Sequence, residues 1–406
     1  MNIWIFNHHA LIPSMSGGTR HYDFAKELVK RGHSVTIIAS SFHYAKLEEM
    51  KEYGHSEYTE ESINQVNFIW LKTPSYSGSG IRRVVNMLSY MFKAIKILPT
   101  LNIEKPDVII GSSVHLFAVY AAFKLSKVYK SAFIMEVRDL WPQTLIDMGI
   151  SKWHPFILLL TWLEKFLYKK ADKIITTLPK AHLYIENLGI DKKKIEWISN
   201  GTDISNVKIH FKQKLDSSKF NILYTGTHGL ANNLEILVDV ANDLQEDETI
   251  HFTFLGDGPL KDKLMQKTKK LQLKNITFLA SVPKSEVFDY LYSTDLLYVG
   301  LKDSPLYKYG MSMNKVFDYL SVKKPVLFVS SMPENIIAIA NAGKVIIKDD
   351  KIAISKAIKD FSRMDVLELK KYGNNGFEYL KNNFSIEILV NKLEHLLKST
   401  TKEKSV

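Results

Sequence analysis

Short apolar runs alternate with amphipathic segments along nearly the whole chain. The runs have the length of buried strands, and the segments between them have helical spacing. In the first half, strands are predicted at Asn2–Asn7, Val35–Ala39, Val66–Leu71, Val108–Ile110, Ala132–Val137 and Lys173–Thr177. In the second half, they are predicted at Phe220–Tyr224, His251–Leu255, Ile276–Leu279, Leu296–Val299, Val326–Val329 and Val345–Ile347. This alternation predicts the α/β class, with doubly wound parallel sheets covered by helices on both faces.

The alternation is interrupted once, around I-E-W-I-S-N-G-T-D at residues 195–203. An Asn-Gly turn ends a short strand there, and the polar segment that follows has no clear period. We therefore predict an N-terminal domain over 1–203, a second domain over 204–380, and a C-terminal helix and tail over 381–406 that packs back toward the first domain. Within that last part, the amphipathic pattern predicts a helix over Ile386–Leu397 and then a polar tail. Ligands of such sheets bind beyond the carboxyl ends of the strands, so a central cleft between the domains is the expected site.

The composition is that of a soluble globular protein, with 46% hydrophobic and 24% charged residues. The absence of cysteine excludes disulfides, thiolate zinc sites and a cysteine nucleophile, and it fits a reducing compartment. The N-terminus, M-N-I-W-I-F-N-H-H-A, is typical of a first strand and not of a signal peptide. No apolar stretch approaches the ~20 residues of a transmembrane helix. We therefore expect a cytoplasmic protein.

The net charge of +11 is not concentrated in a basic domain, so we expect no nucleic-acid partner. One basic stretch remains, because no acidic residue lies between Glu61 and Glu104. That stretch contains Lys72, Arg82, Arg83, Lys93 and Lys96. Within it, residues 81–99 have an apolar stripe at helical spacing. Core packing explains the stripe, whereas a helix lying on an anionic membrane surface explains both the stripe and the missing acids.

In each predicted domain, the first strand is followed by a glycine-containing loop. In S-M-S-G-G-T-R-H, Gly17 and Gly18 allow a ligand to approach the backbone, and the helix that follows offers free N–H groups to an anion. The loop is neither G-x-G-x-x-G nor a P-loop, so a plain flexible loop is an equal alternative. In Y-T-G-T-H-G-L, Gly226 precedes His228 at the equivalent place of the second domain, and a neutral histidine can donate a hydrogen bond to a phosphate.

Other candidates follow strands of both domains. His115 lies just past one strand end, and Arg138 and Asp139 follow another, where they form either a ligand site or a salt bridge between loops. The turn G-D-G-P-L contains Gly256 and is adequately explained as a strand–helix connection. In M-S-M-N-K-V-F-D-Y-L, Lys315 and Asp318 share one side of a predicted helix. They are either a solvated surface pair or a ligand site.

The ordered set of these motifs resembles a GT-B-fold glycosyltransferase of family four. It is similar to the N-acetyl-L-fucosamine transferases of bacterial O-antigen and capsule assembly. The resemblance implies two Rossmann-like domains and retaining transfer of an N-acetylated amino sugar or deoxy sugar from a nucleotide-sugar, expected to be UDP-linked. It implies an acceptor glycan linked to undecaprenyl diphosphate, at the inner face of the cell membrane. No metal and no further cofactor are expected.

The resemblance also implies roles for individual residues. Gly17 and Gly18 match a loop near the donor phosphates, and His115 matches a histidine that contacts the transferred sugar. Lys315 matches a lysine that meets the diphosphate, and Asp318 matches a carboxylate that holds the ribose. We predict the donor site from Gly17, Gly18, Arg138, Gly226, His228, Gly256, Lys315 and Asp318, catalytic roles for His115 and Asp139, and an acceptor-side position for Arg20 and His21.

The chain departs from the family pattern at three positions. Gly310 stands where the family has a glutamate, and Thr227 and Asn233 stand where many members have Arg and Lys. Two alternatives therefore stay open. A UDP-sugar 2-epimerase would need carboxylates for proton abstraction. A non-catalytic nucleotide-sugar-binding subunit would be compatible with the missing glutamate.

Overall fold

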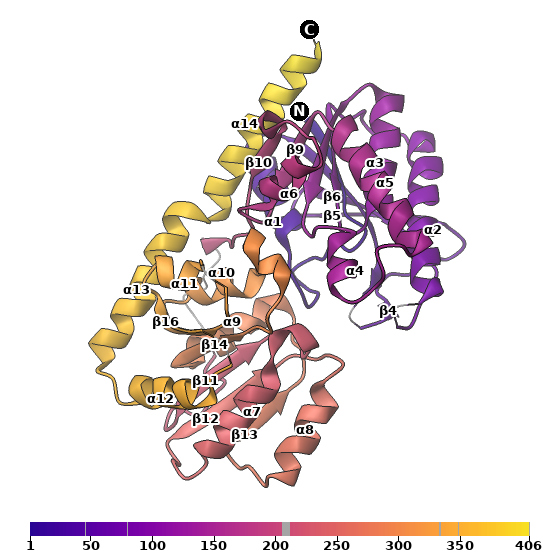
Figure 1. Cartoon of the computed structure of the whole chain (residues 1–406). Coiled ribbons are helices and arrows are strands. Elements are labelled where there is room, and N and C mark those ends of the chain that lie inside the picture. Colours follow the sequence, from indigo (N-terminus) through magenta and orange to yellow (C-terminus); the bar gives the residue numbers. More distant parts are fainter. Residues whose placement is uncertain (45, 79, 205–211, 333, 348, 406) are drawn as a thin grey trace. The chain divides into compact units, whose positions relative to one another are not determined.

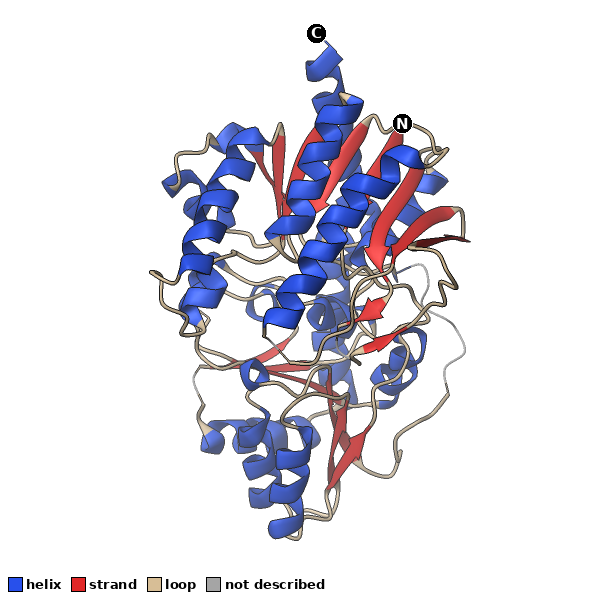
Figure 2. Ribbon diagram, turned by 90° about the vertical axis from the view of Figure 1, so that its right-hand side faces the viewer, coloured by secondary structure: helices blue, strands red, loops and turns tan. Residues whose placement is uncertain are grey.

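The computed structural model describes every residue except 45, 79, 205–211, 333, 348 and 406. The chain forms two compact units, each built on one twisted sheet with helices around it (Figures 1 and 2). The first unit consists of Met1–Ile12, Thr19–Ser199 and Ile386–Val406, and the second consists of Pro13–Gly18 and Asn200–Ser385. Neither unit is therefore continuous in sequence.

The first unit contains an eight-stranded sheet with the order β10-β9-β8-β7-β1-β2-β6-β5. Its strands are β1 (Asn2–Phe6), β2 (Ser34–Ser40), β5 (Tyr58–Ile63), β6 (Val66–Leu71), β7 (Val108–Ser112), β8 (Ala132–Val137), β9 (Lys173–Thr176) and β10 (Ile195–Trp197), and a separate short ladder joins β3 (Phe42–His43) to β4 (Glu48–Glu49). All neighbouring strands of the sheet are parallel except the edge strand β5, which pairs antiparallel with β6. The sheet order places β1 and β7 at the centre.

Helices cover this sheet on both faces (Figure 1). They are α1 (Arg20–Lys30), α2 (Ile81–Ile97), α3 (Leu116–Tyr129), α4 (Gln143–Asp147), α5 (Pro155–Lys170), α6 (Ala181–Asn187) and α14 (Ile386–Ser405), with short 3-10 helices η1 (Leu98–Thr100) and η2 (Lys192–Lys194). α3 packs against β7 and lies between α2 and α5, whereas α1 packs against β2 and α14. α5 begins at Pro155, and the His154 side chain caps it by accepting from the Phe156 N–H at 3.2 Å.

The C-terminal helix is longer than the pattern of apolar residues predicts. α14 continues to Ser405, so the prediction of a polar tail after Leu397 is wrong. The additional turns are held by polar contacts: Thr400 Oγ1 donates to the Leu396 carbonyl at 2.6 Å, and Lys404 Nζ donates to the Ser131 carbonyl at 2.7 Å and to Asp172 at 2.8 Å. Neither the local contact of Thr400 nor the contacts of Lys404 to residues distant in sequence leave an apolar period.

The second unit contains a six-stranded parallel sheet with the order β13-β12-β11-β14-β15-β16. Its strands are β11 (Phe220–Thr225), β12 (Ile250–Leu255), β13 (Ile276–Leu279), β14 (Leu296–Gly300), β15 (Val326–Val329) and β16 (Gly343–Ile346). Its helices are α7 (Leu234–Asp243), α8 (Lys261–Lys270), α9 (Lys284–Ser293), α10 (Asn314–Ser321), α11 (Ile336–Ile339), α12 (Lys351–Ser362) and α13 (Val366–Asn383), with 3-10 helices η4 (Leu230–Asn232) and η5 (Pro305–Tyr309). The predicted fold class, two parallel-sheet α/β domains, is confirmed.

The core of the second unit lies between one face of its sheet and helices α7 and α12. The aromatic side chains of Tyr224, Phe252, Phe254 and Tyr298 are fully buried there together with apolar residues of both helices. This packing fixes the carboxyl ends of β11 and β12, after which the two glycine loops begin. Among the described residues, no helix is long and apolar enough to span a bilayer.

Candidate functional site

The two glycine loops of the second unit pack backbone against backbone. The amide of Gly226 donates to the Leu255 carbonyl, and the amide of His228 donates to the Asp257 carbonyl, both at 2.9 Å. A Cβ atom at Gly256, where φ is +143°, would lie 2.0 Å from the carbonyl oxygen of Gly226. Only glycine permits so close an approach. The G-D-G-P turn therefore positions the loop that carries His228.

Lys315 projects from the first turn of α10 toward this loop. Its Nζ donates to the Tyr224 hydroxyl at 2.8 Å and to Asn232 Oδ1 at 3.1 Å, and it lies 4.1 Å from the centre of the Tyr224 ring. Among the residues that the structure describes, no carboxylate lies within ion-pair distance of Nζ. Burial lowers the pKa of Lys315 to about 7. An anion bound beside Nζ would restore its full charge, so this lysine is suited to a phosphate.

His228 is fully buried beside Lys315, between aromatic rings. The ring centres of Tyr224, Phe254 and Phe278 lie 5.9, 6.2 and 6.1 Å from that of His228. In the described part of the chain, neither ring nitrogen has a hydrogen-bond partner. Burial, followed by the charge of Lys261, lowers the pKa of His228 to about 4, so the ring is neutral at pH 7. A neutral imidazole with one free donor and one free acceptor can bind a ligand oxygen.

The glycine loop that follows β1 belongs to the second unit and not to the first. Segment Pro13–Gly18 groups with Asn200–Ser385, and a Cβ atom at Gly18 would lie 2.1 Å from Nδ2 of Asn314. Asn314 is the first residue of α10 and directly precedes Lys315. The structure therefore brings Gly18, which the sequence associates with the donor phosphates, next to the start of the helix that carries Lys315.

Asp318 and Lys315 do not form the solvated pair that was one alternative. Asp318 is 7% exposed, its Oδ1 accepts from Thr202 Oγ1 at 3.1 Å, and its Oδ2 forms an ion pair with Lys284. No pattern in the sequence points to Lys284, because it lies 34 positions earlier, on α9. The assignment of Asp318 to the ribose stays a prediction, and any ribose hydroxyl would compete with Lys284 and Thr202 for this carboxylate.

In the first unit, Glu136 binds both residues that were predicted on the acceptor side. Arg20 Nε donates to Glu136 Oε1 at 2.9 Å, and His21 Nε2 bonds to Oε2 at 2.6 Å. Burial acts to raise the pKa of Glu136, but His21 and Arg20 outweigh it and hold that pKa well below its usual range. Arg20 also donates to the carbonyls of Ile198 and Ser199. These contacts give Arg20 and His21 a positioning role at the start of α1, and their acceptor-side role stays a prediction.

His115 forms a buried pair with His8, which sequence reasoning did not single out. His115 caps α3 by accepting from the Ala118 N–H at Nδ1, at 3.2 Å. Its Nε2 must therefore carry the proton and donate to His8 Nδ1, at 2.6 Å. The proton of His8 is then on Nε2, which has no partner among the described residues. Contact of His115 with the transferred sugar stays a prediction, and the free hydrogen-bonding capacity of the pair lies on His8.

Arg138 and Asp139 follow β8 but do not pair with each other in the described structure. The backbone N–H of Arg138 donates to Ser113 Oγ at 3.1 Å, and the Asp139 carbonyl accepts from the Trp141 N–H at 3.0 Å. Asp139 is exposed. The alternative of a salt bridge between loops is therefore not observed. The roles predicted for Arg138 in donor binding and for Asp139 in catalysis stay predictions.

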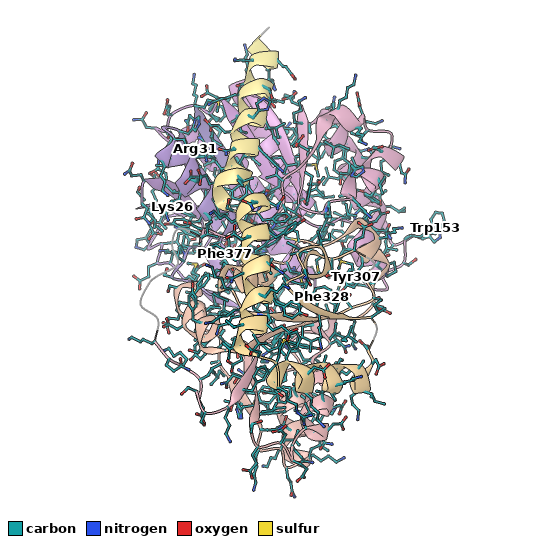
Figure 3. All side chains as sticks on the ribbon, turned by 90° about the vertical axis from the view of Figure 1, so that its left-hand side faces the viewer. Lys26, Arg31, Trp153, Tyr307, Phe328 and Phe377 are labelled. Atoms are coloured by element: carbon teal, nitrogen blue, oxygen red, sulfur yellow. The ribbon has the colours of Figure 1, made fainter. Side chains whose placement is uncertain are left out.

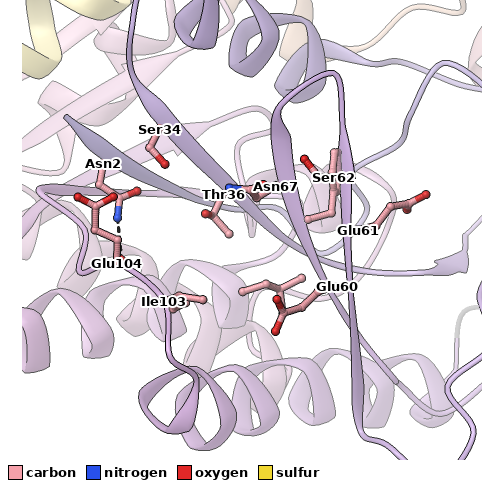
Figure 4. Close-up of a pocket in the computed structure, with 11 residues that line it drawn as sticks. Asn2, Ser34, Thr36, Glu60, Glu61, Ser62, Asn67, Ile103 and Glu104 are labelled. Atoms are coloured by element: carbon pink, nitrogen blue, oxygen red, sulfur yellow. Dashed lines mark hydrogen bonds between the residues drawn. The ribbon is translucent and has the colours of Figure 1, made fainter.

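A cavity in the first unit lies away from these residues (Figure 4). Its volume is about 430 Å³, and it is lined mainly by polar side chains near the amino ends of β1, β2 and β6, among them Asn2, Ser34 and Asn67. Asn2 Nδ2 donates there to the Glu104 carbonyl at 2.6 Å. Because His8 and His115 follow the carboxyl ends of β1 and β7, this cavity lies at the opposite edge of the sheet, and none of the predicted site residues lines it.

Comparison with known proteins assigns both halves of the chain. Residues 16–206 match the family model "Glycosyltransferase Family 4", and residues 219–363 match the model "Glycosyl transferases group 1". The putative colanic acid biosynthesis glycosyl transferase WcaI of Escherichia coli is 22% identical over 282 residues, which cover 66% of this chain and 68% of that protein. The probable glycosyltransferase WbjE of Pseudomonas aeruginosa is 21% identical over 288 residues, covering 68% of this chain and 70% of that protein.

Solved structures agree in fold over nearly the full length. Sucrose-phosphate synthase from Thermosynechococcus elongatus superposes with a TM-score of 0.73 at 14% identity, over 98% of both chains. Anabaena HepE in complex with UDP-glucose superposes with a TM-score of 0.66 at 12% identity, over 98% of this chain and all of that one. At these identities the likeness shows the fold alone. Taken with the two family models and the named relatives, it shows that this chain is a glycosyltransferase of the GT-B fold.

Proposed function

We propose that the chain transfers a sugar from a UDP-sugar to a lipid-linked glycan in the assembly of a bacterial cell-surface polysaccharide, with retention at the anomeric carbon. The expected sugar is an N-acetylated amino sugar or a deoxy sugar. The observation that carries the proposal is Lys315, a half-buried cation without a described counter-ion, beside the glycine loops and the unpartnered ring of His228. The relative WcaI, named for colanic acid biosynthesis, supports a polysaccharide product, and HepE, which was crystallised with UDP-glucose, supports a UDP-sugar donor.

The proposed chemistry needs positioning and charge more than a protein nucleophile. The leaving diphosphate gains negative charge as the glycosidic bond breaks, and preorganised donors that meet this charge lower the barrier. Lys315 Nζ uses two of its three N–H groups on Tyr224 and Asn232, which leaves one for a phosphate oxygen. A neutral His228 supplies a second donor. Together they stand in for the basic residues that many family members carry where this chain has Thr227 and Asn233.

The buried carboxylates argue against the epimerase alternative. Proton abstraction needs a carboxylate that is free to act as a base. Asp318 is bound to Lys284 and Thr202, and Glu136 is bound to Arg20 and His21. Both are therefore held as structural anions. The non-catalytic alternative is not supported either, because the family models and the named relatives are glycosyltransferases.

We further propose that the outward face of helices α2, α3 and α5 contacts an anionic membrane surface (Figure 1). The predicted stripe of α2 divides in the structure: Met91 is buried, whereas Ile81 is 83% and Phe92 63% exposed. On α5, Trp162 is 60% exposed, and Trp153 just before the helix points away from the ribbon (Figure 3). Exposed aromatic and aliphatic side chains beside lysines are typical of surfaces that lie at a bilayer interface.

Charge on these three helices is complementary to anionic lipid. The only acidic residue in α2, α3 and α5 is Glu164, which is 1% exposed. Burial raises the pKa of Glu164 to about 8, so this carboxyl is mostly uncharged at pH 7. One basic residue of the predicted surface is already paired, because Lys93 forms an ion pair with Glu57. The remaining arginine and lysine side chains of the three helices supply the positive charge.

The donor part of the proposal is tested by measuring the nucleoside diphosphate released from a panel of UDP- and GDP-sugars, with and without lipid acceptor. Release of UDP and free sugar from a UDP-sugar by the wild-type chain, lost in Lys315→Ala, is the expected result. Lys274→Ala is a matched control, since this lysine is exposed and its side chain has no described partner. Formation of an epimer, or saturable donor binding with no product even when acceptor is present, would contradict the proposal.

A further inference from the structure

Several buried nitrogen atoms of the first unit lack a hydrogen-bond partner among the described residues. Besides Nε1 of Trp4, they are Nε of Arg83, both ring nitrogens of His9, and Nε2 of His8. A buried polar group left unpaired is destabilising, so native structures contain few of them. Four such atoms on three neighbouring residues indicate a ligand that supplies the missing oxygen atoms.

These residues lie around the ring of His8. The Tyr90 ring of α2 stacks on His8 with 4.4 Å between ring centres and 10° between planes, and the His9 ring stacks on His8 at 4.3 Å. The Tyr90 hydroxyl donates to the Ile38 carbonyl at 2.6 Å, which fixes this face of α2 against the sheet. Arg83 precedes Tyr90 by seven residues, so it lies two turns earlier on the same inward face.

Arg83 brings positive charge to this region and forms no ion pair among the described residues. The first turn of α2 contains no acidic residue, and its N-cap, Gly80, offers no side chain to the free N–H groups. Burial, then the charges of Arg83 and Arg138, lower the pKa of His9 to about 3. A neutral imidazole beside the unpaired Arg83 is an environment that an anion would stabilise.

The outer side of the same helical turn is apolar. Ile81 is 83% and Val85 is 47% exposed, and both flank Arg83 in sequence. A free phosphate or a nucleotide has no use for these side chains. A diphosphate attached to a long hydrocarbon chain has both the anion for Arg83 and the apolar surface for Ile81 and Val85.

We infer that Arg83 and His9 bind the diphosphate group of the lipid-linked acceptor, with Ile81 and Val85 against the first part of its hydrocarbon chain. The inference rests on the proposed function, because it specifies how the acceptor of that reaction is held. Arg83 donates to the phosphate oxygens, and His9 donates one further hydrogen bond. Substrate recognition at this site therefore depends on the lipid diphosphate, apart from the sugar that it carries.

The test uses the full chain and two probes, inorganic diphosphate and farnesyl diphosphate below its micelle concentration. Both are titrated calorimetrically after the chain has been saturated with UDP, which occupies the proposed donor site. We expect binding of both probes, with farnesyl diphosphate the tighter. Arg83→Gln should weaken both at least tenfold, whereas the double variant Ile81→Ser with Val85→Ser should weaken only farnesyl diphosphate. Arg82→Gln is the matched control, because Arg82 is the exposed neighbour on the same helix.

Equal binding by wild type and Arg83→Gln would overturn the inference, and so would an equal loss in Arg82→Gln, which would indicate attraction to the general surface charge. If Arg83→Gln fails to fold, His9→Gln replaces it, and unchanged binding in that variant would be equally decisive. Failure of the proposed function is seen separately, as absence of UDP binding in the first titration. Normal UDP binding without diphosphate binding would refute the acceptor site alone.

Discussion

Lys315 is the side chain whose charge depends most directly on what binds beside it. Replacing it with alanine removes the cation that meets the leaving diphosphate, so turnover should fall by a factor of about 100 or more. Thermal stability should stay nearly unchanged, because Lys315 has no described ion pair and its Nζ bonds only to Tyr224 and Asn232. Steady-state kinetics and a melting curve of the same preparation test both statements. Normal turnover in Lys315→Ala would show that Lys315 takes no part in the reaction.

The lowered pKa of Lys315 predicts a pH dependence of donor binding. With a pKa of about 7, Nζ is protonated below pH 7 and loses its proton above it. Because UDP binds the charged form more tightly, affinity for UDP should be lost as pH rises from 7 to 9, by at most about tenfold for each unit. Lys315→Arg keeps its charge over this range and should give a flat profile. Calorimetric titrations that show identical profiles for the two proteins would contradict the assignment.

A substitution of His228 should have different effects on protein stability and on donor binding. Replacing it with phenylalanine removes two unpartnered nitrogen atoms from an aromatic environment, so the free energy of unfolding should stay equal or rise. Donor affinity should fall about tenfold or more, since the replaced ring cannot donate to a phosphate oxygen. Chemical denaturation and UDP titration measure the two effects. A stable variant with unaltered UDP affinity would show that His228 is only a packing residue.

The glycine at the position of the missing family glutamate is required by the backbone. Gly310 has a φ of +78°, a conformation that costs other residues about 1–2 kcal/mol. Gly310→Glu should therefore lower the free energy of unfolding by about that amount and should not raise turnover. Gly229→Ala is the matched control, because its φ is −115° and an added Cβ atom would meet nothing closer than 3.5 Å. A gain in activity in Gly310→Glu would contradict this account, because it would show that the backbone accepts a glutamate at position 310 and that the carboxylate takes part in the reaction.

Helices α2, α3 and α5 act together in the proposed membrane contact. The variant with Ile81, Phe92 and Trp162 all changed to serine should bind phosphatidylglycerol vesicles several-fold more weakly than wild type, since each change removes exposed apolar surface. Neutralising Arg82 and Lys96 should reduce the same binding, and added salt should have the same effect. Ile352→Ser, at an exposed position of α12 in the second unit, is the control. Equal vesicle binding by all variants in a sedimentation assay would show that this surface does not contact the membrane.

The final turns of α14 contribute to the stability of the first unit. Deleting residues 398–406 should lower the free energy of unfolding, because it removes the contacts of Thr400 and Lys404. Lys404→Ala alone should cost less than about 1 kcal/mol, since its ion pair with Asp172 is partly exposed. Denaturation of the two variants side by side distinguishes these effects. An unchanged stability after the deletion would show that the contacts are dispensable.

The chain's sheets could be predicted far more fully than its site. Buried parallel strands carry continuous apolar runs, and Val66–Leu71, Ala132–Val137, Ile276–Leu279 and Val326–Val329 coincide with observed strands. The edge strand β5 was missed, since Y-T-E-E-S-I is half exposed and largely polar. The helices were located by their period, but their ends depend on side-chain contacts such as the His154 cap.

The partnerships within the candidate site leave no local pattern in the sequence. Glu136 lies 116 positions from Arg20, and His8 lies 107 positions from His115. Lys315, His228 and Gly226 were predicted because each lies where strand and helix meet, at the ligand-binding edge of such a sheet. Lys284 and Arg83 do not follow a strand in this way. Their proposed roles depend on neighbours that are distant in sequence and that only the structure shows.

The division of the chain into units has a consequence for synthesis. Most of the first unit, including its sheet, precedes the second unit in the chain, whereas its helix α14 follows the second unit. All segments of the second unit have therefore been translated before α14 is made. Until α14 has been translated, the side of α1 that packs on α14 is exposed to chaperones and to other nascent chains.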